Sequence, residues 1–312
     1  AAAIDAASAG DAQADALVDV GGADVEGDAA PTAADYGLAG PHAVAKSTAT
    51  VVVGFSSFVL HIWAPTSSGA HPVVILSPGL QQPAAAYAVY GERLASHGIT
   101  ALIRDDPGAF VTTPVVSADI AAVVETWLPA AHAAPSGPLA GKVDLDHIGL
   151  AGHSRGGKAS AVAASVDLKG KVLGWFGLDP IDSVVLGGAL ARDVIGGAGI
   201  PVAMLGAAVS GACSPAADNY EVIFAASSSP AVSLTAVGAG HVQFEQASAC
   251  VLCALCAPAG SADGAVVLAL SVRYLTAFFA RELIGDTSVG AGFDGAGFAA
   301  DAQAGWVTRT MK

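Results

Sequence analysis

The chain has 312 residues, of which 53% are hydrophobic and only 13% charged, so general disorder is excluded and a sizeable core is expected. Its net charge of −14 comes largely from the first 36 residues, which hold eight acidic and no basic side chains. The remaining 19 acidic and 13 basic residues give residues 37–312 a modest net charge of −6, which is no reason to expect a nucleic-acid-binding face.

Residues 1–36 are dominated by Ala, Asp and Gly, and no apolar period persists there. Such a segment buries too little surface to offset its chain entropy, so we predict a disordered acidic tether followed by one domain over 37–312. The chain starts with Ala and shows no signal segment, and acidic linkers are common behind the signals or lipid anchors of exported bacterial proteins. We therefore expect a secreted or cell-surface-anchored protein.

Strands and helices alternate from residue 37 onward. The apolar runs predict eight strands, at 49–53, 58–64, 73–76, 99–103, 148–151, 173–178, 201–205 and 232–237. Helices are predicted through Tyr87 to Gly98, from a Ser117 cap onward, after residue 157, and over 265–283. Arg273 interrupts the last of these, which favours a core helix over a membrane span. The Gly- and Ala-rich last 25 residues are expected to lie over the surface.

This alternation predicts an α/β protein with a mainly parallel central sheet of about eight strands and helices on both faces. One sequence within it carries chemistry: residues 152–156 read Gly-His-Ser-Arg-Gly, directly after an apolar strand and before a run of small residues. This G-x-S-x-G arrangement is typical of a nucleophile elbow. The turn is so tight that Gly152 and Gly156 have no room for side chains, and it presents the hydroxyl of Ser154 near a helix N-terminus.

A nucleophilic serine needs a base, and in this fold the chain order is serine, acid, histidine. Eight histidines occur, but only His241 follows Ser154. It stands in Gly238-Ala239-Gly240-His241, just after the 232–237 strand, on a loop flexible enough to bring the imidazole to the sheet edge. We therefore predict that His241 is the base.

The acid is less directly indicated, because the usual loop, residues 206–211, contains no carboxylate. The preceding strand ends in Asp179, with Asp182 three residues later, and Asp218 is a third candidate. Catalytic groups collect at the carboxyl ends of parallel strands, which favours Asp179. Asp105 and Asp106 precede the serine, so the chain order makes them poor candidates.

The motif at 152–158 resembles the nucleophile motif of chlorophyllases, within the dienelactone-hydrolase-related α/β-hydrolases. That group also includes polyester (cutinase-like) hydrolases and platelet-activating-factor acetylhydrolases. The resemblance spans about residues 40–285 and is carried further by Ser96–Ile99, Val124–Leu128, Gly177–Pro180, a segment with Cys213, Pro215, Asn219 and Phe224, and Gly240-His241. One departure concerns the substrate: Val242-Gln243-Phe244 stand where chlorophyllases have acidic and Met residues after the histidine.

The resemblance implies an α/β-hydrolase fold and hydrolysis of an ester through an acyl-enzyme. Ser154 would be the nucleophile, His241 the base and Asp179 the orienting acid. The oxyanion donors would be the backbone N–H groups of Arg155 and of Leu80, which matches the family's Pro-Gly-aromatic turn. No cofactor or metal is expected.

Five largely uncharged positions are expected to contact the substrate: Gln81, Gln82, Pro180, Val242 and Phe244. They favour a neutral or hydrophobic ester, such as a polyester or lipid ester, over a phosphoester. We expect a monomer that acts on a small or polymeric ester, without nucleic-acid partners. Two alternatives are a chlorophyllase proper and a catalytically silent surface-binding protein that keeps the fold.

The four cysteines are Cys213, Cys250, Cys253 and Cys256. The C-x-x-C-x-x-C spacing of the last three is compatible with an iron–sulfur or zinc site, but no fourth close ligand accompanies it. Two disulfides in an exported protein are the favoured interpretation, with Cys213 tied to the 250–256 segment. Three pairings are open, and the sequence does not choose among them.

Overall fold

The computed structural model describes residues 35–312 except 54–55, 106–110 and 247–255. The strands are β1 (Val44–Val53), β2 (Ser56–Pro65), β3 (His71–Ser77), β4 (Thr100–Arg104), β5 (Val143–His153), β6 (Gly174–Leu178), β7 (Val202–Ala207), β8 (Ala231–Ala236) and β9 (Val307–Met311). The α-helices are α1 (Ala88–Ser96), α2 (Thr113–Ala122), α3 (Leu128–Ala133), α4 (Arg155–Val162), α5 (Ala191–Val194), α6 (Tyr220–Ala226), α7 (Gly264–Phe279) and α8 (Ala296–Gln303).

All the described strands form one sheet in the order β1-β2-β4-β3-β5-β6-β7-β8-β9. Strands β3 to β8 pair in parallel, while β1, β2 and β9 add antiparallel edges. The carboxyl ends of β5, β6 and β8 therefore meet at the same edge of the sheet. The candidate catalytic residues follow these three ends.

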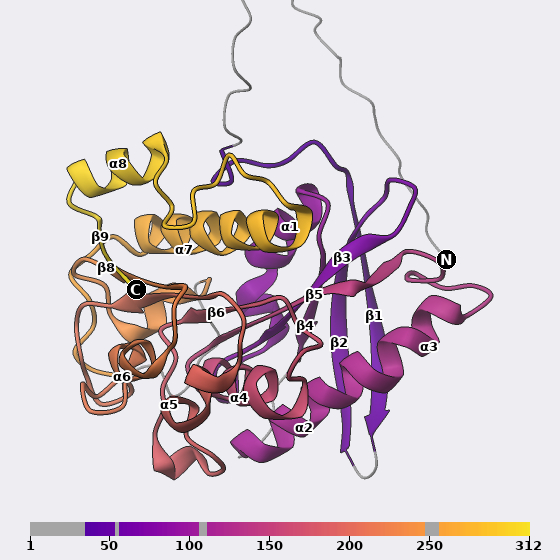
Figure 1. Cartoon of the computed structure of the whole chain (residues 1–312), viewed down its shortest axis with the longest axis horizontal. Helices are drawn as coiled ribbons and strands as arrows, with labels where there is room; N and C mark the ends of the chain where they lie inside the picture. Colours follow the sequence, from indigo (N-terminus) through magenta and orange to yellow (C-terminus); the bar gives the residue numbers. More distant parts are fainter. Residues whose placement is uncertain (1–34, 54–55, 106–110, 247–255) are drawn as a thin grey trace, which may run out of the picture. The chain divides into compact units, whose positions relative to one another are not determined.

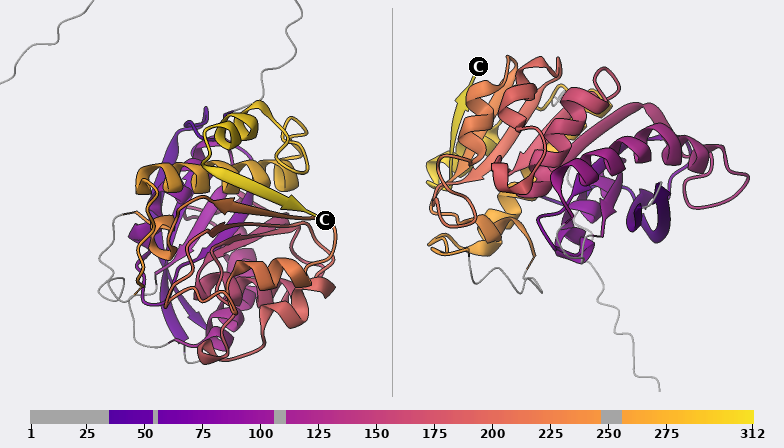
Figure 2. Two further views of the ribbon diagram at one scale, coloured as in Figure 1. Left: turned by 90° about the vertical axis from the view of Figure 1, so that its left-hand side faces the viewer. Right: turned by 90° about the horizontal axis from the view of Figure 1, so that it is seen from below.

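Helices cover both faces of the sheet, with α1 and α7 on one and α2 to α6 on the other (Figure 1). Alternation along β3 shows why: Val74 and Leu76 pack with α1 and α7, whereas Val73 and Ile75 pack toward α2 and α4. Successive side chains of a strand point to opposite faces, so a continuous apolar run needs cover on both. Figure 2 shows the strands fanning out as the sheet twists.

The helix Gly264–Ile284, which comprises α7 and its last wide turn, is long and apolar enough to cross a membrane. Its side chains nevertheless pack into the core, and 61% of its most apolar window is buried. Phe278, for example, lies 5.6 Å from the ring of Phe176 in β6. It is the core helix of this domain.

The α/β expectation is confirmed, with nine described strands rather than about eight. The additional strand is β9, in the Gly- and Ala-rich C-terminal segment that we expected to lie over the surface. It pairs antiparallel with β8, from Val232↔Met311 to Ala236↔Val307. Its alternating Val-Thr-Arg-Thr-Met sequence is a strand pattern, but at five residues it is too short to stand out from sequence alone.

Two boundaries also differ from the sequence prediction. Helix α2 begins at Thr113 with Pro114 in its first turn, a position for which proline is preorganised, so Ser117 lies inside the helix and is not its cap. At the N-terminal side, residues 1–34 of the predicted tether lie outside the described residues. Tyr36, which we placed in the tether, is only 7% exposed and its hydroxyl bonds to Asp286.

Candidate active site

The turn between β5 and α4 has the geometry of a nucleophile elbow. Ser154 adopts φ 55°, in the left-handed region that few non-glycine residues occupy. A Cβ on Gly152 would lie 2.3 Å from the carbonyl oxygen of Gly156, and one on Gly156 would lie 2.1 Å from that of Ser77. Both glycines are therefore required by contact with backbone, which cannot move aside.

Three side chains from three strand ends form one hydrogen-bonded line. The hydroxyl of Ser154 lies 2.9 Å from Nε2 of His241, and Nδ1 of His241 lies 2.6 Å from Oδ2 of Asp179. Asp179 is fully buried, and its other carboxylate oxygen accepts the backbone N–H of Ala207 at 2.9 Å. The last residue of β7 thus supplies a donor that orients the carboxylate following β6.

The two competing carboxylates are engaged elsewhere. Asp182 is fully buried and accepts the backbone N–H groups of Ala191 and Arg192, at 2.6 and 3.0 Å, where α5 begins. The guanidinium of Arg192 bonds to Asp182 and also to Asp218, both at 2.7 Å. Asp182 and Asp218 therefore belong to one ion-pair group that anchors α5, away from His241.

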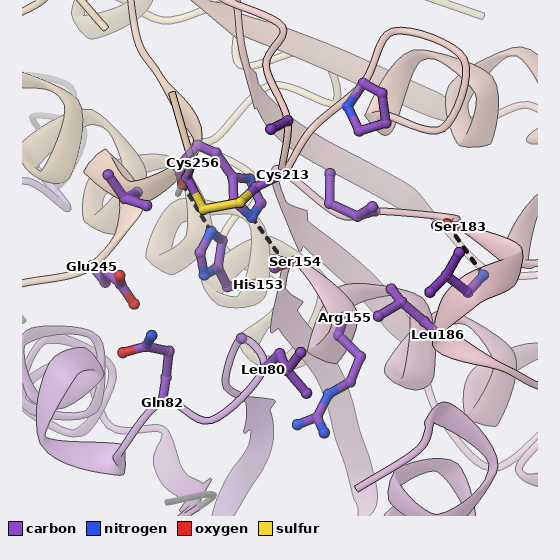
Figure 3. A pocket seen from close by; sticks show the side chains of 17 residues that line it. Leu80, Gln82, His153, Ser154, Arg155, Ser183, Leu186, Cys213, Glu245 and Cys256 are labelled. Atoms are coloured by element: carbon purple, nitrogen blue, oxygen red, sulfur yellow. Dashed lines mark hydrogen bonds between the residues drawn. A yellow bond between two sulfur atoms is a disulfide. The ribbon is translucent and has the colours of Figure 1, made fainter. Parts of the chain in front are cut away.

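The loop after β3 lies beside the serine, as an oxyanion-binding loop must. Leu80 lines the same cavity as Ser154, and its N–H has no acceptor among the described residues. Arg155 contributes the first N–H of α4, next to the serine hydroxyl. Its guanidinium points away from Ser154 (Figure 3), and burial, together with Arg104, lowers the pKa of Arg155 to about 10.

These groups open into a cavity of about 390 Å³. Ser154 and His241 line it together with apolar side chains from the loops after β6 and β7. No cluster of three metal-ligating side chains occurs in the described ranges. The cavity is thus a mainly apolar chamber with a nucleophile–base pair in its wall.

Comparison with known families adds to this geometry. Residues 23–175 match the PETase family, described as PET hydrolase-like. Over these residues the chain is similar to polyester hydrolases, and its fold is that of an α/β-hydrolase. The match contains the elbow but ends within β6, before Asp179 and His241, and it indicates a hydrolase that acts on esters. Comparison with curated proteins gave no match.

Of the five expected substrate contacts of this α/β-hydrolase, Gln82 and Val242 line the cavity. The other three do not, and the expectation for them is corrected. Phe244 is fully buried behind His153, with ring centroids 6.1 Å apart. Pro180 packs beneath the elbow, where a Cβ on Gly157 would approach it to 2.6 Å. Gln81 lies in the loop outside the lining, at φ 62°.

Residues 183–187, which follow β6 and are called the strap below, form one wall of the cavity that the sequence did not reveal. Ser183, Val185 and Leu186 line the cavity, and Val185 is 89% exposed at its mouth. Lys158 of α4 holds both ends of this strap, since its fully buried ammonium donates to the carbonyls of Ser183 and Gly187 at 2.8 and 3.0 Å. Burial lowers the pKa of Lys158, which nearby Asp182 partly offsets.

A disulfide forms part of the opposite wall (Figure 3). Cys213, from the loop after β7, bonds to Cys256 across 43 residues, and both line the cavity. This agrees with the expectation that Cys213 is tied to the 250–256 segment. Cys250 and Cys253 lie outside the described residues.

Three buried polar residues behind the serine were also missed. His153 is enclosed between Tyr87, 2.7 Å from its Nδ1, and the carbonyl of His241, 3.0 Å from its Nε2. The Tyr87 hydroxyl lies in turn 3.1 Å from Glu245, a carboxyl group in the cavity lining. Burial, and then proximity to His241, hold the pKa of His153 well below its usual value. The only sequence signal was the motif position of His153, which says nothing of its partners.

Proposed function

We propose that the chain is a serine carboxylic-ester hydrolase acting through an acyl-enzyme. The observation that carries the proposal is the unbroken line from Ser154 through His241 to Asp179, with the serine at the wall of an open cavity. His241 takes the serine proton as the hydroxyl attacks the ester carbonyl, and Asp179 holds the imidazole and stabilises its charged form. Water then releases the acyl group by the same path.

The oxyanion would be held by the N–H groups of Leu80 and Arg155. Removal of one such donor costs about 3 kcal/mol in comparable sites. A backbone donor is preferred to a charged side chain here, because it is fixed by the fold and needs no reorganisation as charge develops.

The cavity favours a neutral, hydrophobic ester. Ile181, Val185, Leu186 and Pro215 line it, and the disulfide adds a further apolar wall. The family match supports a polyester-type or lipid ester in preference to chlorophyll. The disulfide is compatible with an oxidising compartment, which supports export of the protein. We further propose that the enzyme acts as a monomer.

The proposal is tested by labelling with an active-site-directed fluorophosphonate, followed by assays on p-nitrophenyl esters of increasing chain length and on a polyester film. We expect labelling of the wild type, none of Ser154→Ala, and turnover of p-nitrophenyl butyrate. An unlabelled, inactive wild type would instead favour the silent surface-binding alternative. Activity on phosphomonoesters without activity on the butyrate would contradict the substrate class.

A further inference from the structure

The hydroxyl of Tyr87 contacts three loops of the candidate site. It lies 3.1 Å from the backbone N of Gly79 in the oxyanion loop, 2.7 Å from Nδ1 of His153 in the elbow, and 3.1 Å from Oε2 of Glu245 after the catalytic histidine. Tyr87 is fully buried. A Cβ on Gly79 would come within 3.1 Å of His153, so the loop rests directly on this group.

His153 connects the hydroxyl of Tyr87 to the backbone of His241. Its Nε2 faces the backbone carbonyl of His241 at 3.0 Å, and the two rings lie 4.8 Å apart. A carbonyl oxygen only accepts hydrogen bonds, so Nε2 carries a hydrogen. In a neutral ring Nδ1 is then an acceptor, and it receives the Tyr87 hydroxyl.

The tyrosine hydroxyl has one hydrogen and two acceptors within reach. It donates to Oε2 of Glu245 at 3.1 Å, and Nδ1 of His153 lies nearer, at 2.7 Å. A charged His153 would be a buried cation beside His241, which is costly in a low-dielectric interior, so a neutral His153 shares the hydroxyl with Glu245.

We propose that Tyr87 is a positioning residue of the active site, with its hydroxyl held between His153 and Glu245. The proposal rests on the proposed ester hydrolysis. One hydroxyl sets the orientation of the oxyanion loop and, through His153, the backbone of His241, so that the donor and the base keep their positions relative to the serine.

The first test compares Tyr87→Phe with Tyr90→Phe. Tyr90 is a matched control, because it lies in the first turn of α1, which Tyr87 caps, is fully buried, and donates one hydrogen bond to the histidine loop, to the carbonyl of Phe244 at 2.6 Å. For Tyr87→Phe we expect kcat on p-nitrophenyl butyrate to fall on the order of 10- to 100-fold with KM changed less than about threefold. Tyr90→Phe should lose less than about threefold in kcat. Equal losses in the two variants would overturn the proposal.

The second test compares Glu245→Gln with Glu245→Leu, and it remains decisive if Tyr87→Phe fails to fold. The glutamine side chain keeps an oxygen that accepts from the Tyr87 hydroxyl, whereas leucine has a similar size and no polar atom. We expect kcat of the Gln variant to exceed that of the Leu variant by about tenfold. Equal kcat values would show that the Tyr87 hydroxyl needs no polar partner at this position and would overturn the part of Glu245 in the proposal.

The two proposals fail in different ways. A wild type that resists fluorophosphonate labelling overturns the hydrolase and this inference together. A wild type that is labelled and active, combined with an unimpaired Tyr87→Phe, overturns only the role of Tyr87.

Discussion

Asp179 and Asp182 stand three residues apart on the segment that follows β6, and both are fully buried. Their surroundings differ. Asp179 receives one backbone N–H and the imidazole of His241, whereas Asp182 receives two backbone N–H groups and the guanidinium of Arg192. A buried carboxylate is stable only when its oxygens accept hydrogen bonds. Both side chains accept from backbone N–H groups, and they differ in that Asp179 is bonded to a histidine and Asp182 to an arginine.

The difference indicates which carboxylate suits the proposed chemistry. Asp179 is bonded to the candidate base His241, so its charge would be available to stabilise an imidazolium. Asp182 is neutralised by Arg192, a permanent cation, and anchors the start of α5. Tertiary partners alone therefore distinguish the candidate triad acid from a structural carboxylate three residues away.

The strongest way to break this comparison is Asp179→Asn. The amide keeps the shape but cannot stabilise a charged imidazolium, so we expect turnover to fall by about three to four orders of magnitude with the fold retained. Steady-state kinetics and circular dichroism check both parts. Turnover within about tenfold of the wild type would remove Asp179 from the triad.

Asp182→Asn should give the reverse pattern. It leaves Arg192 without its buried partner, so we expect a loss of about 3 kcal/mol in the free energy of unfolding, but less than a tenfold change in turnover per folded molecule. Denaturant unfolding measures the first and active-site titration normalises the second. Asp218→Asn is the matched control: its side chain is 28% exposed, so less than about 1 kcal/mol is expected.

Two N-terminal deletions separate residues that pack on the domain from residues predicted to contribute nothing to its stability. Removal of residues 1–34 should leave the melting temperature unchanged, because the sequence there lacks an apolar period. Removal of 1–36 also takes away buried Tyr36 and its hydrogen bond to Asp286, together with the ion pair of Asp35 with Arg273, and we expect a fall of several degrees. Equal melting temperatures for the two deletions would show that Tyr36 contributes little.

The variant Lys158→Met tests whether Lys158 anchors the strap, which begins directly after Asp182. The variant keeps much of the aliphatic length but releases the carbonyls of Ser183 and Gly187, so the wall that carries Val185 loses its anchor. We expect the ratio of kcat/KM for octanoate to that for butyrate esters to change about three- to tenfold. Lys171→Met is the control, since Lys171 pairs with Glu125 at the surface. A similar ratio in both variants would contradict an anchoring role.

Much of the fold was predictable because its signals are local. The apolar runs of β3 to β8 and the helices predicted between and after them are what a parallel sheet covered on both faces requires, and the α/β expectation is confirmed. The elbow was predictable because its motif stands between an apolar run and a run of small residues, although the carbonyl that excludes a side chain at Gly156 belongs to Ser77 in another strand. The strand β9 was not, because five alternating residues acquire their structure only from pairing with β8.

The candidate site divides in the same way. The sequence by itself determined the elbow, the identity of His241 as the one histidine after Ser154, and a short choice among carboxylates; the roles of these residues stay predictions. Only the tertiary structure decided that Phe244 and Pro180 pack beneath the site, that Lys158 reaches the strap, and that Tyr87, His153 and Glu245 form one chain. Motif chemistry depends on neighbours along the chain, whereas burial and hydrogen-bond partners depend on residues brought together across 25 to 158 positions, as from Lys158 to Ser183 and from Tyr87 to Glu245.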